Sequence, residues 1–546
     1  MKLSHPLALL SLALAAPALA QTAPPVVQAP AGAVRGTTEG ALRVFRGIPY
    51  AQPPVGGLRW RQPRPLPHWT GVRAATAFGP ACVQPQGGPA SVYSPAAPLP
   101  VSEDCLTLNI WAPADAAHAP VFFWIHGGAL LTGSSREPMY DGAKLAAQGI
   151  VVVSINYRLG VLGWLAHPDL SRESPAQVSG NYGLLDQIGA LTWVRDNIAA
   201  FGGDPKQVTI AGESAGGLSV LYLMETPLAR GLFARAIAQS SYMVSMAELK
   251  RATLGAPSAE AVGQMLAGAL QAPDLASLRG MDAQAVTNAA AKLGFAPFGV
   301  VDGKLLPEQM TTAFDAGRQA RVPVLAGFNQ GEIRSLRMLA PPAPATAAAY
   351  EATIRARYGD LADAFLRLYP AAVYRESILA ATRDALYGWT AERLAVKQTA
   401  VGQPAYLYQW DHGYPAMDSA GLHAFHASEL PFVFGTIATL PPRWPAIPDS
   451  AGERALSDAM VGYWASFTRG GVPQAAGAAT WQAYGTAGHY LRFGETPVAA
   501  TGLFPGMYAL NEAVMCRRRA TGKVGWNWNV GLVSPNLPPD VPACRQ

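Results

Sequence analysis

The chain has 546 residues, of which 50% are apolar and only 14% are charged, which excludes an intrinsically disordered chain and allows a large buried core. The formal net charge of +5 is small for this length. Basic residues are scattered apart from an arginine triplet at 517–519, which we expect on a solvated surface, so the sequence predicts no nucleic-acid partner.

The N-terminus has the pattern of a secretory signal peptide. Lys2 precedes an apolar run over residues 6–16, and an Ala-Leu-Ala cleavage site ends at Ala20. The run is too short to span a bilayer, and no later segment offers an unbroken apolar span. We therefore expect a signal peptide over residues 1–20, cleavage after Ala20, and a secreted or periplasmic protein without a membrane span.

Short apolar runs alternate with helical patterns along most of the chain. Residues 119–128, 149–158, 207–214 and 321–329 are apolar segments bounded by turn residues and are predicted as buried strands. Residues 184–201 repeat apolar side chains at helical spacing. Strands that alternate with helices favour a mostly parallel sheet with helices on both faces.

Residues 343–401 differ from the rest of the chain. They show long Ala-, Leu- and Arg-rich helical pattern without a strand signal, and a strand-like run resumes at residues 404–411. This order indicates an insertion rather than a second domain. The sequence therefore predicts a single α/β domain over residues 21–546, with a helical insertion at about 343–401.

The segment GESAG at residues 212–216 fits the G-x-S-x-G pattern. An apolar strand pattern precedes it and a helical pattern follows it, which is the context that this motif requires. A sharp turn from strand to helix places the Ser214 hydroxyl at a helix N-terminus, where developing negative charge is stabilised. Because a serine hydroxyl needs a base to act as a nucleophile, we expect an acidic residue and then a histidine downstream.

Four further motifs precede this segment: FRGIPYAQPP (45–54), SEDCLTLNIW (102–111), NYRLGVLGW (156–164) and GNYGLLDQIGALTWVRDNIAAFGGDP (180–205). In this order they resemble the type-B carboxylesterase family, which also contains cholinesterases and some lipases. The likeness extends over most of residues 30–490. It implies the α/β-hydrolase fold, and an enzyme that cleaves small-molecule carboxylic esters through an acyl-enzyme intermediate.

The resemblance also implies which carboxylate serves as the acid. The family's glutamate stands in a segment that GFNQGEI reproduces at residues 327–333, which makes Glu332 the acid. Gly331 and Ile333 depart from the family pattern, so the surroundings of Glu332 are expected to differ from those in the family.

The family's histidine stands six residues before a run that HASELPFVFG reproduces at residues 426–435. This spacing implies that His426 is the base, and His423 is the competing candidate. In the roles that the family implies, Ser214 attacks the ester carbonyl, His426 transfers the proton and Glu332 orients the imidazole. By the same family pattern, Ser240 is expected to support the triad by hydrogen bonding.

The glycine loop HGGA at residues 126–129 implies an oxyanion hole. Matched to the family, its donors are the backbone N–H groups of Gly128, Ala129 and Ala215. Ala129 keeps its N–H but adds a methyl, which costs about 1 kcal/mol if φ is positive there. We expect a competent oxyanion hole with a tighter acyl side than three glycines would give.

The four cysteines allow three pairings, and in an exported chain we expect disulfides rather than free thiols. The nearest-neighbour pairs are Cys82–Cys105 and Cys516–Cys544. The resemblance supports the first, because its flanks are similar to the ends of the family's omega loop. Tyr93 is the only aromatic residue between these cysteines, so the stacking tryptophan of cholinesterases is missing and cholinesterase activity is not expected.

Two alternatives accompany the esterase prediction. One is a lipase in which the 343–401 insertion covers the site as a lid. The other, from a different class, is a non-catalytic adhesion or binding relative, which the presence of a complete triad disfavours. The sequence has no Walker loop, dinucleotide fingerprint or close Cys/His set, so it predicts neither a cofactor nor a metal.

Overall fold

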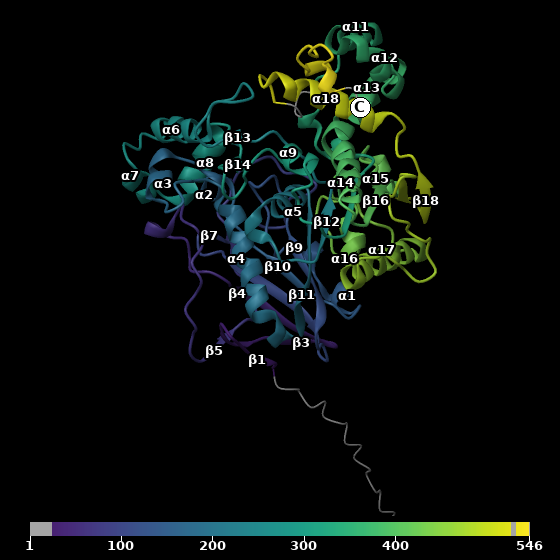
Figure 1. Cartoon of the computed structure of the whole chain (residues 1–546). Coiled ribbons are helices and arrows are strands. Elements are labelled where there is room, and N and C mark those ends of the chain that lie inside the picture. Colours follow the sequence, from purple (N-terminus) through teal and green to yellow (C-terminus); the bar gives the residue numbers. More distant parts are fainter. Residues whose placement is uncertain (1–23, 526–530, 545–546) are drawn as a thin grey trace, which may run out of the picture.

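The computed structural model describes residues 24–525 and 531–544, so the predicted signal peptide and its cleavage site lie outside the described residues. An 11-stranded sheet crosses the molecule in the order β18-β17-β16-β15-β12-β11-β9-β10-β8-β4-β3 (Figure 1). From β17 to β10, neighbouring strands pair in parallel. The predicted mostly parallel sheet is therefore confirmed.

The parallel strands are β9 (Ala119–Ile125), β10 (Val151–Ile155), β11 (Gly203–Glu213), β12 (Arg235–Gln239), β15 (Val324–Asn329), β16 (Ala405–Trp410) and β17 (His489–Phe493). The antiparallel strands are β3 (Thr37–Glu39), β4 (Leu42–Pro49) and β8 (Thr107–Pro113) at one edge and β18 (Pro497–Thr501) at the other.

Strand β9 shows why the parallel strands have continuous apolar sequences. Val121, Phe123 and Ile125 enter the apolar core on one face of the sheet. Phe122 and Trp124 enter a separate core on the other face. Because both faces of the sheet are covered, the residues that point to either face can be apolar, and the strand needs no alternating polar residues.

Helices pack against both faces of the sheet, as predicted. The first core includes residues of α4 (Tyr182–Asn197), α5 (Ala215–Glu225) and α14 (Trp389–Ala400). The second includes residues of α1 (Ala143–Ala146), α16 (Leu430–Phe434) and α17 (Ala451–Gly470). The carboxyl ends of the parallel strands therefore meet at one edge of a rigid layered structure, which is where ligands bind in open α/β sheets.

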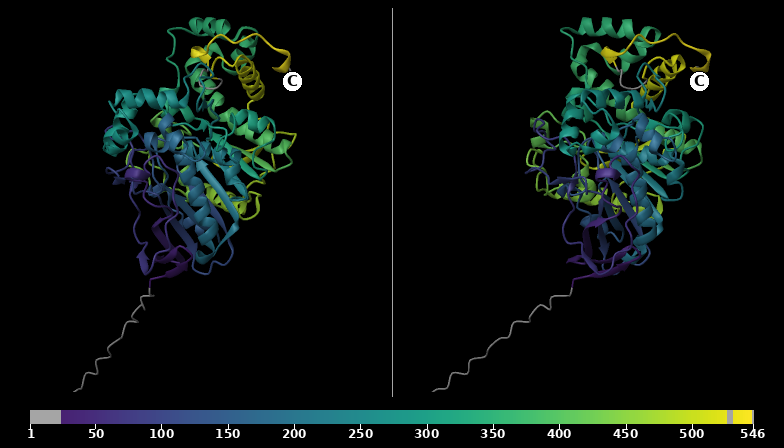
Figure 2. Two further views of the ribbon diagram at one scale, coloured as in Figure 1. Left: turned by 60° about the vertical axis from the view of Figure 1, so that its left-hand side comes forward. Right: turned by 90° about the vertical axis from the view of Figure 1, so that its left-hand side faces the viewer.

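Residues 343–401 form two structural parts. The helices α11 (Ala347–Tyr358), α12 (Ala362–Leu368) and α13 (Tyr374–Arg383) pack with α18 (Met507–Thr521) around a separate apolar cluster. They form the block that projects at the top of Figures 1 and 2. A π-helix, Asp384–Gly388, then leads into α14, which lies against β15 and β16. The last helix of this segment thus belongs to the layer that covers the sheet.

The arginine triplet on α18 is not the solvated surface that the sequence predicted. Arg517 and Arg518 are buried, and Arg517 pairs with Asp360 at 2.7 Å. Arg519 pairs with Asp315 at 2.8 Å. The prediction was wrong because acidic residues distant in sequence neutralise the charges of Arg517 and Arg519, which no local pattern reveals.

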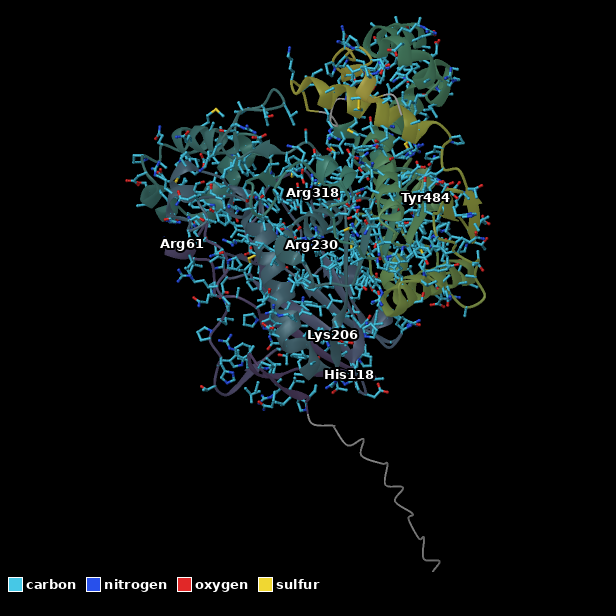
Figure 3. All side chains as sticks on the ribbon, in the orientation of Figure 1. Arg61, His118, Lys206, Arg230, Arg318 and Tyr484 are labelled. Atoms are coloured by element: carbon cyan, nitrogen blue, oxygen red, sulfur yellow. A yellow bond between two sulfur atoms is a disulfide. The ribbon has the colours of Figure 1, made fainter. Side chains whose placement is uncertain are left out.

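Other basic side chains are distributed over the molecule. Arg61, Lys206 and Arg318 lie at separate places in Figure 3, and Arg318 is paired with Glu308 at 2.6 Å.

Within residues 24–525 and 531–544, no helix is both long and apolar enough to cross a membrane.

Candidate active site

The GESAG segment forms a sharp turn between β11 and α5. Ser214 has φ 56° and ψ −120°, a conformation that L-residues rarely adopt, and its N–H donates to the carbonyl of Gln239 at 3.0 Å. A Cβ at Gly212 would overlap the backbone of Gly216, and a Cβ at Gly216 would overlap the carbonyl oxygen of Ile125. The glycines of the motif are therefore required by close backbone packing, as the sequence predicted.

The structure brings the other two predicted residues to the same edge of the sheet. Glu332 begins α10 (Glu332–Ser335), directly after β15, and His426 lies in the loop that follows β16. Nδ1 of His426 is hydrogen-bonded to Oε2 of Glu332, and the other carboxylate oxygen accepts from the N–H of Asn329 at 2.8 Å. Both side chains are buried. Because Nδ1 is bonded to Glu332, Nε2 is the imidazole nitrogen that remains for exchange with the nucleophile.

Nε2 of His426 lies 3.1 Å from Oε1 of Glu213, the residue before Ser214. Within the described part of the chain, no hydrogen bond joins His426 directly to Ser214. The imidazole therefore lies beside the elbow, and its second nitrogen is close to the neighbouring carboxylate without a hydrogen bond to it among the described residues.

Buried charges perturb the titration of this group. Burial by itself lowers the pKa of His426, but the negative charges of Glu213 and Glu332 outweigh it and raise the pKa to about 9. Burial raises the pKa of Glu213 to about 8, although the charge of His426 opposes this shift. The carboxyl of Glu213 and the imidazole of His426 therefore each hold the other in its charged form.

The glycine loop presents free backbone donors to the same space. The N–H groups of Gly128, Ala129 and Ala215 make no hydrogen bond to any other residue that the structure describes. Ala129 has φ 57°, so it has the positive φ at which its methyl group is costly. Its side chain is exposed. Beneath the loop, burial lowers the pKa of His126 to about 4, so its neutral ring donates through Nδ1 to the carbonyl of Gly127 at 2.8 Å.

A buried carboxylate that the sequence analysis missed lies behind the triad. Glu429 accepts hydrogen bonds from the side-chain amides of Asn329 at 2.6 Å and Gln239 at 3.0 Å. Burial raises its pKa to about 7, against the lowering effect of the Asn329 bond. The sequence could have indicated this residue, because Glu429 stands three residues after His426 and directly before the apolar run LPFVF.

The π-helix was also missed, and it brings an aromatic ring to the site. Tyr387 is buried, and its ring centroid lies 5.2 Å from that of His426. Such helical irregularities are frequent at functional sites. No residue pattern in the 343–401 segment distinguished this turn from ordinary helix.

The competing histidine is directed away from this group. His423 contacts the carboxylates of Asp418 at 2.8 Å and Asp411 at 3.1 Å. Ser240 is fully buried near the elbow, but its hydroxyl has no hydrogen-bond partner among the described residues. The expected support from the Ser240 hydroxyl is therefore not seen.

The departure at Gly331 has a structural reason. A Cβ at this position would overlap the carbonyl oxygen of His423, and Gly331 forms a parallel bridge with Phe425. The glycine allows the loop that carries Glu332 to lie directly against the loop that carries His426.

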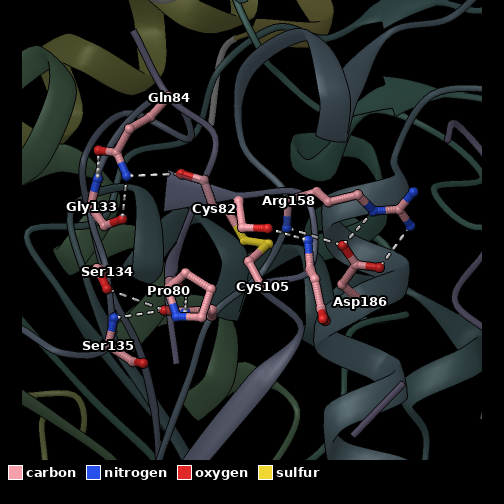
Figure 4. Close-up of a disulfide and its surroundings, with 12 residues drawn as sticks. Pro80, Cys82, Gln84, Cys105, Gly133, Ser134, Ser135, Arg158 and Asp186 are labelled. Atoms are coloured by element: carbon pink, nitrogen blue, oxygen red, sulfur yellow. Dashed lines mark hydrogen bonds and ion pairs between the residues drawn. A yellow bond between two sulfur atoms is a disulfide. The ribbon is translucent and has the colours of Figure 1, made fainter. Parts of the chain in front are cut away.

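Both predicted disulfides are present. Cys516–Cys544 joins α18 to the C-terminal segment, and Cys82–Cys105 closes the loop beside the glycine loop. Figure 4 shows the Cys82–Cys105 disulfide and the residues around it. The side-chain amide of Gln84 donates to the carbonyl of Gly133 at 3.1 Å and accepts from the N–H of Gly133 at 3.0 Å.

Two relatives with similar chains are named as esterases. The model of the Carboxylesterase family matches residues 23–509. A fumonisin B1 esterase of Sphingopyxis macrogoltabida is 36% identical, over 90% of this chain and 91% of its own. A para-nitrobenzyl esterase of Bacillus subtilis is 37% identical, over 83% of this chain and 91% of its own.

Solved structures agree with the sequence comparisons. The crystal structure of a carboxylesterase of Geobacillus stearothermophilus superimposes with a TM-score of 0.71 at 34% identity, and covers 89% of this chain and 99% of its own. The layered sheet described above is therefore the α/β-hydrolase fold. The chain belongs to the carboxylesterase family and is a carboxylic ester hydrolase.

Proposed function

We propose that the protein is an exported serine esterase that works through an acyl-enzyme intermediate, with Ser214 as nucleophile, His426 as base and Glu332 as acid. One observation carries the proposal. The elbow, the hydrogen-bonded His426–Glu332 pair and three backbone N–H groups without acceptors meet at the carboxyl ends of parallel strands.

In the proposed reaction, Oγ of Ser214 forms a bond to the ester carbonyl carbon as its proton passes to Nε2 of His426. The carbonyl oxygen becomes an oxyanion that accepts from the N–H groups of Gly128, Ala129 and Ala215. The bond to the alcohol oxygen then breaks, and His426 returns the proton to this leaving group. Water, activated in the same way, releases the acid and restores the serine.

His426 must exchange a contact to begin this cycle. Its Nε2 lies 3.1 Å from Oε1 of Glu213, and in the reaction it has to form a hydrogen bond to the adjacent Ser214 hydroxyl. Catalytic hydrogen bonds are often long or misaligned without substrate, so this arrangement is consistent with the proposed role.

Labelling by an organophosphate tests the nucleophile. The wild-type protein should take up one label per chain, and Ser214→Ala should take up none. Ser240→Ala is the matched control, because it removes a neighbouring buried hydroxyl and should keep full labelling. A labelled Ser214→Ala variant would overturn the assignment.

Relatives suggest which esters to test first. One is named for fumonisin B1 and another for para-nitrobenzyl esters, so we propose esters of these kinds as substrates. The preference among esters is measured by kcat/KM. The substrates are a series of chromogenic esters with increasing acyl length, then fumonisin B1 and a para-nitrobenzyl ester. If kcat/KM for fumonisin B1 and for the para-nitrobenzyl ester is lower than that for the short chromogenic esters by about 10³-fold or more, the substrate proposal fails.

Export is proposed from the N-terminal pattern and from two disulfides, which persist in oxidising compartments. Sequencing the N-terminus of protein recovered from outside the cytoplasm should give Gln21 as the first residue. An intact Met1 would contradict the predicted cleavage.

A further inference from the structure

Hydrogen bonds hold the main chain that leads to His426. The carbonyl of Ala424 accepts from the N–H of Gly331 at 2.9 Å, and the carbonyl of Phe425 accepts from the side chain of Asn329 at 2.8 Å. Both donors lie at the end of β15. The loop before the imidazole is thus fixed from one side by the end of β15 and the turn that leads to the acid.

The next carbonyl, that of His426 itself, is held from a different part of the chain. Oη of Tyr93, in the Cys82–Cys105 loop, donates to it at 2.8 Å. The same oxygen lies 2.7 Å from Oγ of Ser335. Because a carbonyl oxygen only accepts and tyrosine has one hydroxyl proton, Ser335 is the donor in this second bond.

These two hydrogen bonds connect the acid and the base through a third element. Ser335 is the last residue of α10, whose first residue is Glu332. The chain from Ser335 through Tyr93 to His426 therefore joins the helix of the acid to the main chain of the base. Ser335 and the carbonyl of His426 are thus joined through the Tyr93 hydroxyl, which bonds to both.

The ring of Tyr93 is itself held in place. It packs edge-on against Trp444 with ring centroids 6.0 Å apart, and its centroid lies 6.2 Å from that of Phe425. The disulfide limits the freedom of the loop that carries it. The hydroxyl is thus presented to His426 by a constrained side chain, which is the requirement for a group that sets geometry.

We propose that Tyr93 is a positioning residue that holds the His426 imidazole in register with Glu332 and Ser214. This inference rests on the proposed role of His426. Tyr93 bonds to the main-chain carbonyl of His426, so its effect on the reaction passes through the histidine main chain.

Tyr93→Phe tests the proposal, because it keeps the ring contacts and removes only the hydroxyl. We expect kcat per active site to fall about tenfold, with KM within about twofold of wild type. Acylation and deacylation, followed separately by single-turnover kinetics, should fall by the same factor because both use His426. Active sites are counted by organophosphate titration, so a fraction of unfolded protein does not enter the result.

Tyr484→Phe is the matched control. It removes the same hydroxyl from a tyrosine, labelled in Figure 3, that donates to Glu392 at 2.9 Å. The N–H of Tyr484 donates to the carbonyl of Ala405 at the start of β16, whereas the proposed triad lies at the carboxyl ends of the strands. This variant should keep wild-type kcat per site. A Tyr93→Phe variant that loses titratable sites but keeps kcat per remaining site would show a merely structural role and overturn the proposal.

The outcome also separates this inference from the proposed function. If Ser214→Ala is inactive and Tyr93→Phe has unchanged kcat per site, only the role of Tyr93 is wrong. If Ser214→Ala keeps wild-type activity, the proposed triad fails and the role of Tyr93 fails with it.

Discussion

At the scale of single residues, backbone strain at the site has two different origins. Ser214 is held at positive φ by an elbow in which Gly212 and Gly216 have no room for a side chain. Ala129 adopts φ 57° although a glycine would do so at lower cost. The strain at Ser214 follows from the turn itself, whereas the strain at Ala129 follows from the choice of side chain.

Ala129→Gly should therefore stabilise the protein while keeping its activity. Relief of the positive φ should raise the free energy of unfolding by about 1 kcal/mol, and the backbone N–H donor is retained. Denaturant unfolding measures the first effect, and kcat/KM over an acyl series measures the second. We expect broader acyl selectivity, and unchanged selectivity would count against a steric role for the methyl.

The pH dependence of the reaction is set by the charges around His426. The imidazole must be neutral to accept the serine proton, and its pKa is raised to about 9. Below that pH, kcat/KM should fall about tenfold for each unit of pH. Since Glu213 contributes to the raised pKa, Glu213→Gln should move this limb of the profile to lower pH. A shift to higher pH would contradict the electrostatic explanation.

At the scale of elements, the Cys82–Cys105 loop braces the glycine loop as well as the histidine. Gln84 forms two hydrogen bonds with the main chain of Gly133, a few residues after the proposed oxyanion donors (Figure 4). Other hydrogen bonds hold the same loop, since the Tyr157 hydroxyl donates to the carbonyl of His126 at 2.8 Å and the N–H of Gly160 donates to the carbonyl of Leu130 at 2.8 Å. Gln84 thus adds a contact from a segment that has no part in the triad.

Gln84→Ala should loosen the oxyanion hole without affecting the histidine. We expect a trifluoromethyl ketone, which forms a tetrahedral adduct with serine, to bind about tenfold more weakly, because the adduct needs all the aligned donors. The pH at which kcat/KM is half-maximal should stay at its wild-type value. Unchanged affinity for the ketone would show that the glycine loop is held by its own turn.

At the scale of the whole molecule, α18 anchors the projecting helical block to the body, because Glu512 accepts from the Trp389 indole of α14 at 2.7 Å and Arg519 pairs with Asp315 at 2.8 Å. Residues of α11, α12 and α13 share a buried apolar cluster with α18, and Arg517 pairs with Asp360 across this contact. The disulfide Cys516–Cys544 ties α18 to the C-terminal segment. A lid has to open by breaking few contacts, and this block has many.

We therefore expect no interfacial activation. The rate of triglyceride hydrolysis should rise smoothly through the solubility limit of the substrate. A sharp increase at that limit would favour the lipase alternative and would require the block to move. Cross-linking α11 to α18 by a new disulfide serves as the control, because it should leave the rate on a soluble ester unchanged.

The sequence by itself determined the features that depend on local sterics. The GESAG elbow, its flanking strand and helix, and the parallel sheet follow from glycine positions and from apolar periodicity, since neighbouring residues fix turn geometry and burial. The resemblance to type-B carboxylesterases supplied Glu332 and His426, which are far apart in the chain. Their proposed roles in catalysis stay predictions until the serine is labelled.

Only the tertiary structure decided which groups face one another. The contact of His426 with Glu213, the buried carboxylate of Glu429 and the hydrogen bond from Tyr93 all join distant segments at the edge of the sheet. The burial of the arginines on α18 has the same origin. These pairings depend on strand order and loop packing, which set the distances between side chains and cannot be read from the spacing of residues along the chain.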